Sequence, residues 1–454
     1  MLYRKIISKL EQYFLSHSNK MLIIDGARQV GKSFIIRHVG QRMFPNYIEV
    51  NMEKDKLKDR LFANVRTVEE FMFALSSVAG EKMKGSPEDT LVFIDEIQAY
   101  DQLLTMVKFL MDDGRFTYIA SGSQLGVALK STQSLPAGSM EIEHMYPLDF
   151  EEFLLACSVG DMAIEEMRQR YLRKEGLPDE MHAKILDLFK RYLLVGGLPD
   201  AVNIFLEEHN MVSIRSAHRN IRNIYKRDAA KYEKDSGKVL KIQRIYDMIP
   251  SNLENKKKRV VAKDIEDKKG KRMADYQDEF EYLTAAGIAL EVQAISNPVY
   301  PLSESSSKNL LKLYMNDVGL LTGVLYRNNV KSILDDECGI NLGSVYENVV
   351  AQELKAHGFD LKYYDNKKAG EVDFLVDSTD DLSVLPIEVK SGKDYWIHIA
   401  LDKFLSNGYY DVKRGIVLSN EQRVYTVKGI TYMPVYYSMF IIPAESDRAE
   451  YIEI

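Results

Sequence analysis

A glycine-rich stretch that ends in lysine and serine is the part of the sequence whose residue types point most directly to chemistry. Its spacing, G-x-x-x-x-G-K-S, is that of a Walker A phosphate loop, and it lies between an apolar run that predicts a strand and a segment that predicts a helix. The glycines let the backbone wrap around phosphate oxygens, and the helix start offers free N–H groups. We predict that Lys32 contacts the β- and γ-phosphates of ATP and that the Ser33 hydroxyl binds Mg²⁺. The predicted nucleotide-binding residues of the loop are Gly26, Ala27, Arg28, Gln29, Val30, Gly31, Lys32 and Ser33.

A buried apolar run that ends in two carboxylates, at residues 91–96, has the pattern of a Walker B strand. Parallel strands bring their carboxyl ends to one edge of a sheet, so we expect Asp95 and Glu96 to lie near Lys32. Asp95 is predicted to bind Mg²⁺ through its outer shell together with Ser33, and Glu96 to orient or deprotonate the attacking water. Lys32 and Glu96 are therefore the predicted catalytic residues of this site.

A further predicted strand, at 116–124, ends in small polar residues. A polar side chain there would lie between the two Walker strands and near the γ-phosphate. Ser121 is the predicted nucleotide-binding residue, with Ser123 as the alternative. An ordinary strand-to-loop turn explains these serines equally well.

A second group of residues that could do chemistry lies in the last quarter of the chain. Apolar residues at helical spacing place Glu347 on a helix, and Asp373 lies in an apolar predicted strand. Glu388 and Lys390 share one face of the next strand because side chains alternate along it. We predict that Asp373 and Glu388 bind a divalent cation, completed by Glu347, and that Lys390 positions water or stabilises a pentavalent phosphate. Alternating charge is also typical of an exposed strand face.

The composition limits the class of protein. The chain has 454 residues, a formal net charge of −7 and 28% charged residues, which is typical of a globular protein with several domains. Nucleic-acid contact would have to come from local basic patches. The 2 cysteines have no C-x-x-C spacing, and no apolar run is long enough to span a bilayer. We expect a cytoplasmic protein without membrane contact.

The pattern of predicted elements indicates an α/β chain with four domains. Residues 1–150 form a P-loop NTPase parallel sheet, 151–235 a helical lid, 236–328 a winged helix and 329–454 a nuclease-like α/β domain. The Gly-Gly-Leu-Pro break at 196–199 is either a hinge or, as we favour, a helix end. Trp396 is expected in the core.

The motifs together resemble a large prokaryotic group of AAA-like ATPases in which an uncharacterised C-terminal domain follows the ATPase. The resemblance rests on GARQVGKS, LVFIDEIQ, SGSQ and YPLDFEEF, continues through YLLVGGLP, YKRD and YMNDVGL, and covers essentially the whole chain. Members commonly carry an arginine, a candidate arginine finger, where this chain has Ser139. Because such a finger contributes about a thousandfold or more in rate, Ser139 implies slow intrinsic hydrolysis, unless Arg115 or the basic 215–231 stripe serves in its place.

The order of Glu347, Asp373, Glu388 and Lys390 resembles the PD-(D/E)xK nuclease superfamily, which implies a phosphodiester substrate in DNA or RNA. The expected function is an ATP-binding and hydrolysing switch that controls this nuclease-like domain. The alternatives are an ATP-dependent scaffold, or a DNA-binding regulator, with a catalytically inactive nuclease fold. A second copy of the chain or another protein is an expected partner.

Overall fold

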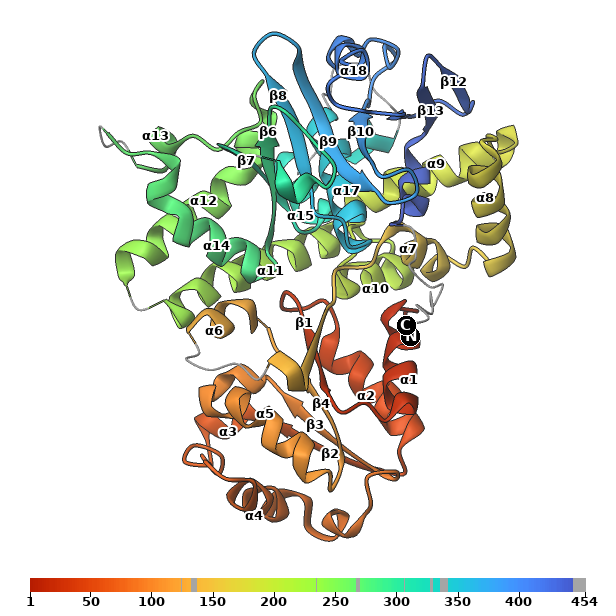
Figure 1. The fold of residues 1–454 in the computed structure, drawn as a ribbon. Coiled ribbons are helices and arrows are strands. Elements are labelled where there is room, and N and C mark those ends of the chain that lie inside the picture. Colours follow the sequence, from red (N-terminus) through yellow and green to blue (C-terminus); the bar gives the residue numbers. More distant parts are fainter. Residues whose placement is uncertain are drawn as a thin grey trace, which may run out of the picture. The chain divides into compact units, whose positions relative to one another are not determined.

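The computed structural model describes residues 1–123, 125–131, 137–233, 235–266, 270–305, 307–326, 330–334 and 342–443. The described part of the chain divides into two compact units (Figure 1). The first comprises Met1–Tyr146 and Tyr282–Ile288, and the second comprises Pro147–Glu281 and Ala289–Ile454. The four-domain division expected from the sequence stays a prediction.

In the described part of the first unit, five strands form one parallel sheet in the order β2-β3-β4-β1-β5. The strands β1 and β3 are buried along their whole length. Both faces of a parallel sheet are covered, which explains why these two strands are near-continuous apolar runs in the sequence. This is the predicted parallel sheet of a P-loop NTPase fold, with β4 between the two Walker strands. The strands are β1 (Met21–Asp25), β2 (Asn46–Asn51), β3 (Thr90–Asp95), β4 (Thr117–Ser121) and β5 (Met140–His144).

Helices cover both faces of this sheet: Figure 1 shows α1 and α2 on one side and α3 and α5 on the other. The predicted helix at 67–78 is α4, which begins with a capping box: the Thr67 side chain accepts from the Glu70 N–H, and the Glu70 carboxylate accepts from the Thr67 N–H. The helices are α1 (Ile6–Ser16), α2 (Lys32–Met43), α3 (Met52–Leu57), α4 (Val68–Ala79), α5 (Asp101–Asp113) and α6 (Leu125–Ser131).

The first unit includes a short segment from much later in the chain, Tyr282–Ile288. Gly287 has a φ of 67°, and a Cβ atom there would lie 3.1 Å from the backbone nitrogen of Ala27 in the phosphate loop. A Cβ atom on Gly126, in α6, would lie 3.0 Å from the carbonyl oxygen of Ala285. The segment therefore packs closely against both the phosphate loop and α6.

The second unit begins with helices, in agreement with the helical character predicted for 151–235. Their role as a lid stays a prediction. Among the described residues of the chain, no helix is both long enough and apolar enough to cross a membrane. The helices before the first strand of this unit are α7 (Phe150–Ala156), α8 (Asp161–Arg173), α9 (Asp179–Val195), α10 (Pro199–Glu208), α11 (Met211–Tyr232), α12 (Ser236–Glu254), α13 (Ala262–Ile265) and α14 (Gln277–Ala285), the last of which ends in the first unit.

The Gly-Gly-Leu-Pro break is a helix end, as favoured from the sequence. Gly196 caps α9 with a φ of 73°, and the proline of the motif opens α10. The Gly197 N–H donates to Asp317 Oδ2 at 2.6 Å, while Asp317 Oδ1 accepts from the Leu320 N–H at 3.0 Å and so caps α15 (Val318–Leu325). Two sequence motifs that lie far apart in the chain thus form one buried joint.

In the described residues of the second unit, eight strands form a mixed sheet in the order β12-β13-β11-β10-β9-β8-β6-β7. The strands β6 and β7 form the antiparallel hairpin expected of a wing, but β6 also pairs in parallel with β8. The hairpin therefore lies at one edge of this sheet, and the predicted winged helix is not confirmed. The strands are β6 (Ala289–Ile295), β7 (Ser307–Met315), β8 (Lys362–Asn366), β9 (Gly370–Ser378), β10 (Ser383–Val389), β11 (Gly415–Ser419), β12 (Tyr425–Val427) and β13 (Ile430–Pro434).

The helix and strands predicted to carry the second acidic site are present in the expected chain order. The helix α17 (Gly343–Ala356) is buried along most of its length and is followed by β8, β9, β10, α18 (Ile399–Leu405) and β11. The neighbours β8 and β9, and β9 and β10, are antiparallel, whereas β10 and β11 are parallel.

Candidate functional site

The phosphate loop spans residues 26–31 between β1 and α2, as predicted. Gly26 has a φ of 142°, and a Cβ atom there would lie 2.3 Å from the carbonyl oxygen of Met145, so no side chain fits. Gly31 has a φ of 100° at the start of α2, which favours glycine. Within the loop, Ala27 and Val30 are buried, Arg28 is half-buried and Gln29 is exposed.

The Lys32 side chain is folded onto the loop. Its Nζ donates to the carbonyl oxygens of Gly26 at 2.7 Å and Ala27 at 2.8 Å, and the residue is buried. Burial lowers the pKa of Lys32, and the nearby carboxylates Glu96 and Asp25 counter this shift. The Lys32 ammonium is thus held at the loop by hydrogen bonds to two neutral carbonyl oxygens.

Four polar side chains converge on Asp95 at the carboxyl end of β3. The Ser33 hydroxyl donates to Asp95 Oδ1 at 2.9 Å, and the Ser121 hydroxyl donates to the same oxygen. The Asn51 amide donates to Asp95 Oδ2 at 2.6 Å. The predicted metal-binding pair, Ser33 and Asp95, is therefore brought together, and Ser121 lies beside it. The fourth group is the Lys32 ammonium, whose charge acts on Asp95 through space.

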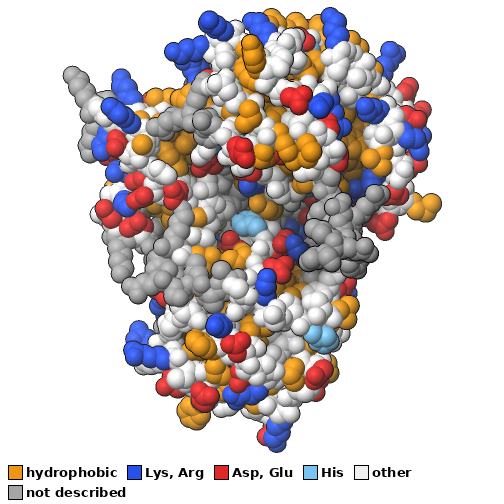
Figure 2. All heavy atoms as spheres, in the orientation of Figure 1, with side chains coloured by type: hydrophobic (Ala, Val, Ile, Leu, Met, Phe, Trp, Pro, Cys, Tyr) orange, Lys and Arg blue, Asp and Glu red, His pale blue; other side chains and the backbone are white. Residues whose placement is uncertain are grey.

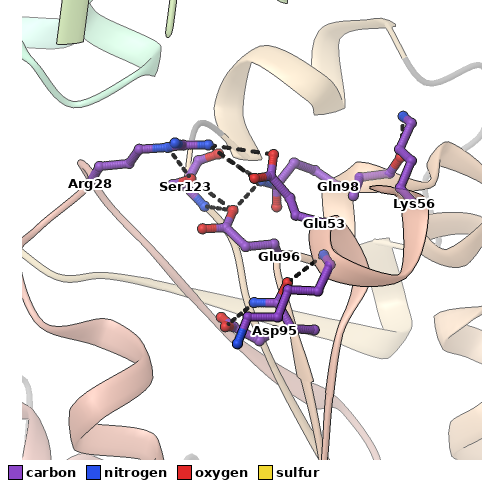
Figure 3. Close-up of polar contacts among 10 residues, drawn as sticks. Arg28, Glu53, Lys56, Asp95, Glu96, Gln98 and Ser123 are labelled. Carbon is purple, nitrogen blue, oxygen red and sulfur yellow. Dashed lines mark hydrogen bonds and ion pairs between the residues drawn. The ribbon is translucent and has the colours of Figure 1, made fainter. Parts of the chain in front are cut away.

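Glu96 is the residue after β3 and has the left-handed backbone conformation, with a φ of 56°. Figure 3 shows its carboxylate beside Ser123 and Gln98. Its Oε2 accepts from Ser123 Oγ at 2.7 Å, from the Ser123 N–H at 3.2 Å and from Gln98 Nε2 at 2.5 Å. Arg28 in turn donates to Ser123 Oγ at 3.3 Å and pairs with Glu53 at 3.4 Å. The two candidate serines thus have separate partners: Ser121 contacts Asp95, and Ser123 contacts Glu96.

Sequence reasoning missed Asn51, Gln98 and Glu53 as members of this site. Asn51 is the last residue of β2 and pairs in register with Asp95. An amide side chain at the end of the strand beside a Walker B strand is the signal that could have found it. Gln124, at the end of the predicted strand 116–124, lies outside the described residues.

Two of the arginines considered as substitutes for a finger, Arg115 and Arg222, have other partners. Ser139 lies at the end of a short 3₁₀ turn before β5. Arg115 pairs with Asp113 at 2.7 Å. In the basic stripe on α11, Arg222 and Lys226 both pair with Asp247 of α12.

The second predicted site also comes together. Glu347 lies on α17, Asp373 on β9 and Glu388 on β10, and the Asp373 carboxylate accepts from the Val389 N–H at 2.8 Å. Lys390 Nζ donates to Glu388 Oε1 at 2.7 Å. Burial and the neighbouring Glu347 and Glu388 carboxylates raise the pKa of Asp373. Among the described residues, no group of three or more His, Cys, Asp and Glu side chains has a geometry that could hold a metal ion.

Lysines that sequence reasoning missed surround these carboxylates. Lys258, which precedes α13, forms an ion pair with Glu347. Lys312, on β7, is fully buried and lies 2.7 Å from Glu371 and 3.8 Å from Glu347. Their approach depends on the pairing of β6 with β8, which no local pattern in the sequence indicates.

The expectation that Trp396 is a core residue is wrong. Its side chain is 56% exposed, and its neighbours Ile397 and Ile399 are also exposed. The helix α18 buries only Leu401 and Phe404, so the segment before it is left at the surface. Figure 2 shows hydrophobic side chains interspersed with lysines and arginines at the top of the view, where Figure 1 places α18 and β8.

Comparisons with known proteins divide the chain into matched regions. Residues 18–154 match the model of an AAA domain. Residues 186–331 and 342–437 match two domains of unknown function, DUF8612 and DUF4143. No curated protein matches the chain.

Among solved structures, the chain is similar to the Walker-type ATPase PABY2304 of Pyrococcus abyssi, with 15% identity, a TM-score of 0.42 and coverage of 71% of this chain and 95% of that chain. It is also similar to the Hsp104–ADP complex of S. cerevisiae, with 14% identity, a TM-score of 0.30 and coverage of 63% of this chain and 37% of that chain. At these identities and TM-scores the likeness carries no argument about function. The AAA match and the geometry at Lys32, Ser33 and Asp95 together support a P-loop, AAA-like ATPase domain at residues 18–154.

Proposed function

We propose that the chain is an ATP-driven switch whose AAA domain binds ATP with Mg²⁺, hydrolyses it, and thereby controls the second unit. The observation that carries this proposal is the convergence of Lys32, Ser33, Asp95 and Glu96 at the carboxyl ends of β1 and β3. These four residues supply a phosphate-binding cation, two oxygen ligands and a general base.

Binding of ATP would exchange the partners of Lys32. Its ammonium now donates to the carbonyl oxygens of Gly26 and Ala27, and anionic phosphate oxygens are stronger acceptors than neutral carbonyls. The N–H groups at the start of α2 add further donors toward the phosphates. Binding energy therefore comes from the loop and its lysine together.

The residues present fit Mg²⁺. The Ser33 hydroxyl and the Asp95 carboxylate are hard oxygen ligands 2.9 Å apart, and Mg²⁺ prefers one or two such protein ligands plus phosphate oxygens. Asn51 and Ser121 orient the Asp95 carboxylate. When bound, the cation neutralises charge that develops on the transferring phosphoryl group.

Glu96 is the proposed general base for the attacking water. Ser123 and Gln98 donate to its carboxylate, so a change in their positions would free it to accept a proton. Because Ser139 stands at the expected arginine-finger position, we expect slow basal hydrolysis.

The test compares ATP binding with phosphate release in two variants and a control. Lys32→Ala should lose ATP binding, whereas Glu96→Gln should bind ATP and hydrolyse it about a hundredfold more slowly, as is typical for loss of a general base. Lys20→Ala, which alters an exposed lysine before β1, should behave as wild type. Normal hydrolysis by Lys32→Ala would show that the site is assigned wrongly.

A second function is proposed for the second unit: a nuclease-like site that acts on or binds nucleic acid. The element order α17-β8-β9-β10-α18-β11 with Asp373, Glu388 and Lys390 close together favours it. A divalent cation fits Asp373 and Glu388, because Glu388 Oε2 is buried and has no hydrogen-bond partner among the described residues. When bound, the cation would supply Lewis-acid activation of a phosphodiester.

This second function is tested by nucleic-acid cleavage with Mg²⁺ or Mn²⁺, with and without ATP, in wild type, Asp373→Ala and Lys390→Ala. Cleavage that is lost in both variants and changed by ATP supports an ATP-regulated nuclease. Steeply salt-dependent DNA binding without cleavage would favour the DNA-binding regulator. No binding to DNA or RNA at low salt would favour the scaffold.

A further inference from the structure

The carboxylates of the second site are matched by lysines. Among the described residues, Glu347, Asp373 and Glu388 interact with one another, and Lys258, Lys312 and Lys390 interact with them through ion pairs or charge. Lys312 is shared with Glu371, which lies 2.7 Å from its Nζ. A divalent cation that entered this set would be repelled by the lysine ammonium groups in a buried environment, where such repulsion is strong.

Glu347 is the carboxylate whose ligand positions are taken. Lys258 pairs with its Oε1, and Tyr314 Oη donates to its Oε2 at 3.0 Å. Lys312 Nζ lies 3.8 Å from the same Oε2. Glu347 is 3% exposed, so its charge is balanced by these neighbours rather than by water.

Lys258 differs from Lys312 in how firmly it is held. The Lys312 side chain is 0% exposed, lies on β7 in the sheet and has Glu371 as its nearer partner. The Lys258 side chain is 21% exposed and comes from a connection between helices. Its φ of 49° is in the left-handed region, which costs about 1 kcal/mol or more for a residue other than glycine. Lys258 is therefore the lysine that can leave the cluster with the least disruption.

We propose that Lys258 is a displaceable internal counter-ion that keeps divalent cations out of the Glu347–Asp373–Glu388 cluster. While Lys258 is paired with Glu347, its ammonium occupies one Glu347 oxygen and repels a cation, so the cluster binds free Mg²⁺ or Mn²⁺ weakly. Withdrawal of Lys258 frees Glu347 Oε1 and removes one positive charge from the cluster, and a cation then binds. The inference rests on the cation site proposed for the second unit.

The test measures Mn²⁺ binding to the full chain by the electron paramagnetic resonance signal of free Mn²⁺, without nucleotide or nucleic acid. Lys258→Met and Lys258→Gln should bind Mn²⁺ at least about tenfold more tightly than wild type, because one like charge near the cation is removed. Lys257→Met, which alters the exposed neighbour, and Lys258→Arg, which keeps the charge, should bind as wild type does.

The gain must also disappear in Lys258→Met/Glu388→Gln, which locates the bound ion in the cluster rather than at the nucleotide site. A folded neutral variant, judged by circular dichroism, that binds Mn²⁺ no more tightly than Lys257→Met would overturn the proposal. Because no nucleotide or nucleic acid is present, this outcome is independent of the ATPase and cleavage assays that test the proposed functions.

Discussion

The buried joint between Gly197 and Asp317 should make the stability of the chain depend on pH in a way that one substitution removes. Asp317 is fully buried, with its oxygens accepting from the Gly197 and Leu320 N–H groups. Burial outweighs these hydrogen bonds and raises the pKa of Asp317 to about 6. Asp317→Asn replaces the ionisable group by a neutral one of the same shape.

The size of the effect follows from the two pKa values. Below the ordinary aspartate pKa of about 4 the carboxyl is protonated in both folded and unfolded chains. Between about pH 4 and about pH 6 the unfolded chain ionises this carboxyl whereas the folded protein keeps it protonated, so stability falls with pH across that window and levels off above it. The difference of about two pKa units is worth about 3 kcal/mol. The asparagine variant does not show this loss of stability with pH. It has one hydrogen-bond acceptor fewer for the buried N–H groups, which lowers its stability by about 1 to 3 kcal/mol at every pH.

The assay is the thermal unfolding temperature of wild type and Asp317→Asn at pH 4.5 and pH 7.5. The variant should be less stable than wild type at pH 4.5. The gap in unfolding temperature should narrow or reverse at pH 7.5 by about 4 °C, because about 1.5 pH units of the window, or about 2 kcal/mol, lie above pH 4.5, at about 2 °C per kcal/mol. Asp200→Asn, at an exposed position in α10, should show a gap that does not change with pH. A constant gap for Asp317→Asn between the two pH values would refute the reasoning.

Two further predictions concern the nucleotide site. Ser123→Ala removes the hydroxyl that donates to Glu96 at 2.7 Å. We expect basal phosphate release to rise by up to about tenfold, because this hydrogen bond to a charged group restrains the proposed general base. A tenfold fall in phosphate release would contradict this reasoning. Gly287→Ala places a Cβ atom 3.1 Å from the Ala27 nitrogen and should weaken ATP affinity severalfold in a titration with a fluorescent analogue. Gly270→Ala, at another positive φ but with no atom within 4 Å, should leave affinity unchanged, and equal losses in both would show that the loop contact is irrelevant.

The parts of the nucleotide site that are set by local sequence could be predicted. The loop glycines, Lys32 and Ser33 lie between a strand and a helix, and Asp95 and Glu96 end an apolar strand, so chemistry and element type are read from neighbouring residues. Asn51 could not be found in this way. Its contact with Asp95 arises from the register of β2 on β3, which depends on packing across the sheet.

In the second unit, too, the elements could be predicted from local sequence, whereas the pairing of distant strands could not. The helix and strands that carry Glu347, Asp373 and Glu388 follow from hydrophobic patterning. The hairpin of β6 and β7 also follows from the pattern, but its pairing with β8 does not. That pairing helps to bring Lys312 to the carboxylates, and it extends the sheet where a separate wing was expected.

The return of Tyr282–Ile288 to the first unit has a consequence for where the chain can be cut. The backbone passes between the two units at three points, after residues 146, 281 and 288. A fragment that stops near residue 150 keeps every Walker residue but lacks the segment that packs on Ala27 and Gly126. The segment that packs on Ala27 is continuous in the chain with α14 before it and with β6 after it, so these two elements are joined covalently to the neighbour of the phosphate loop.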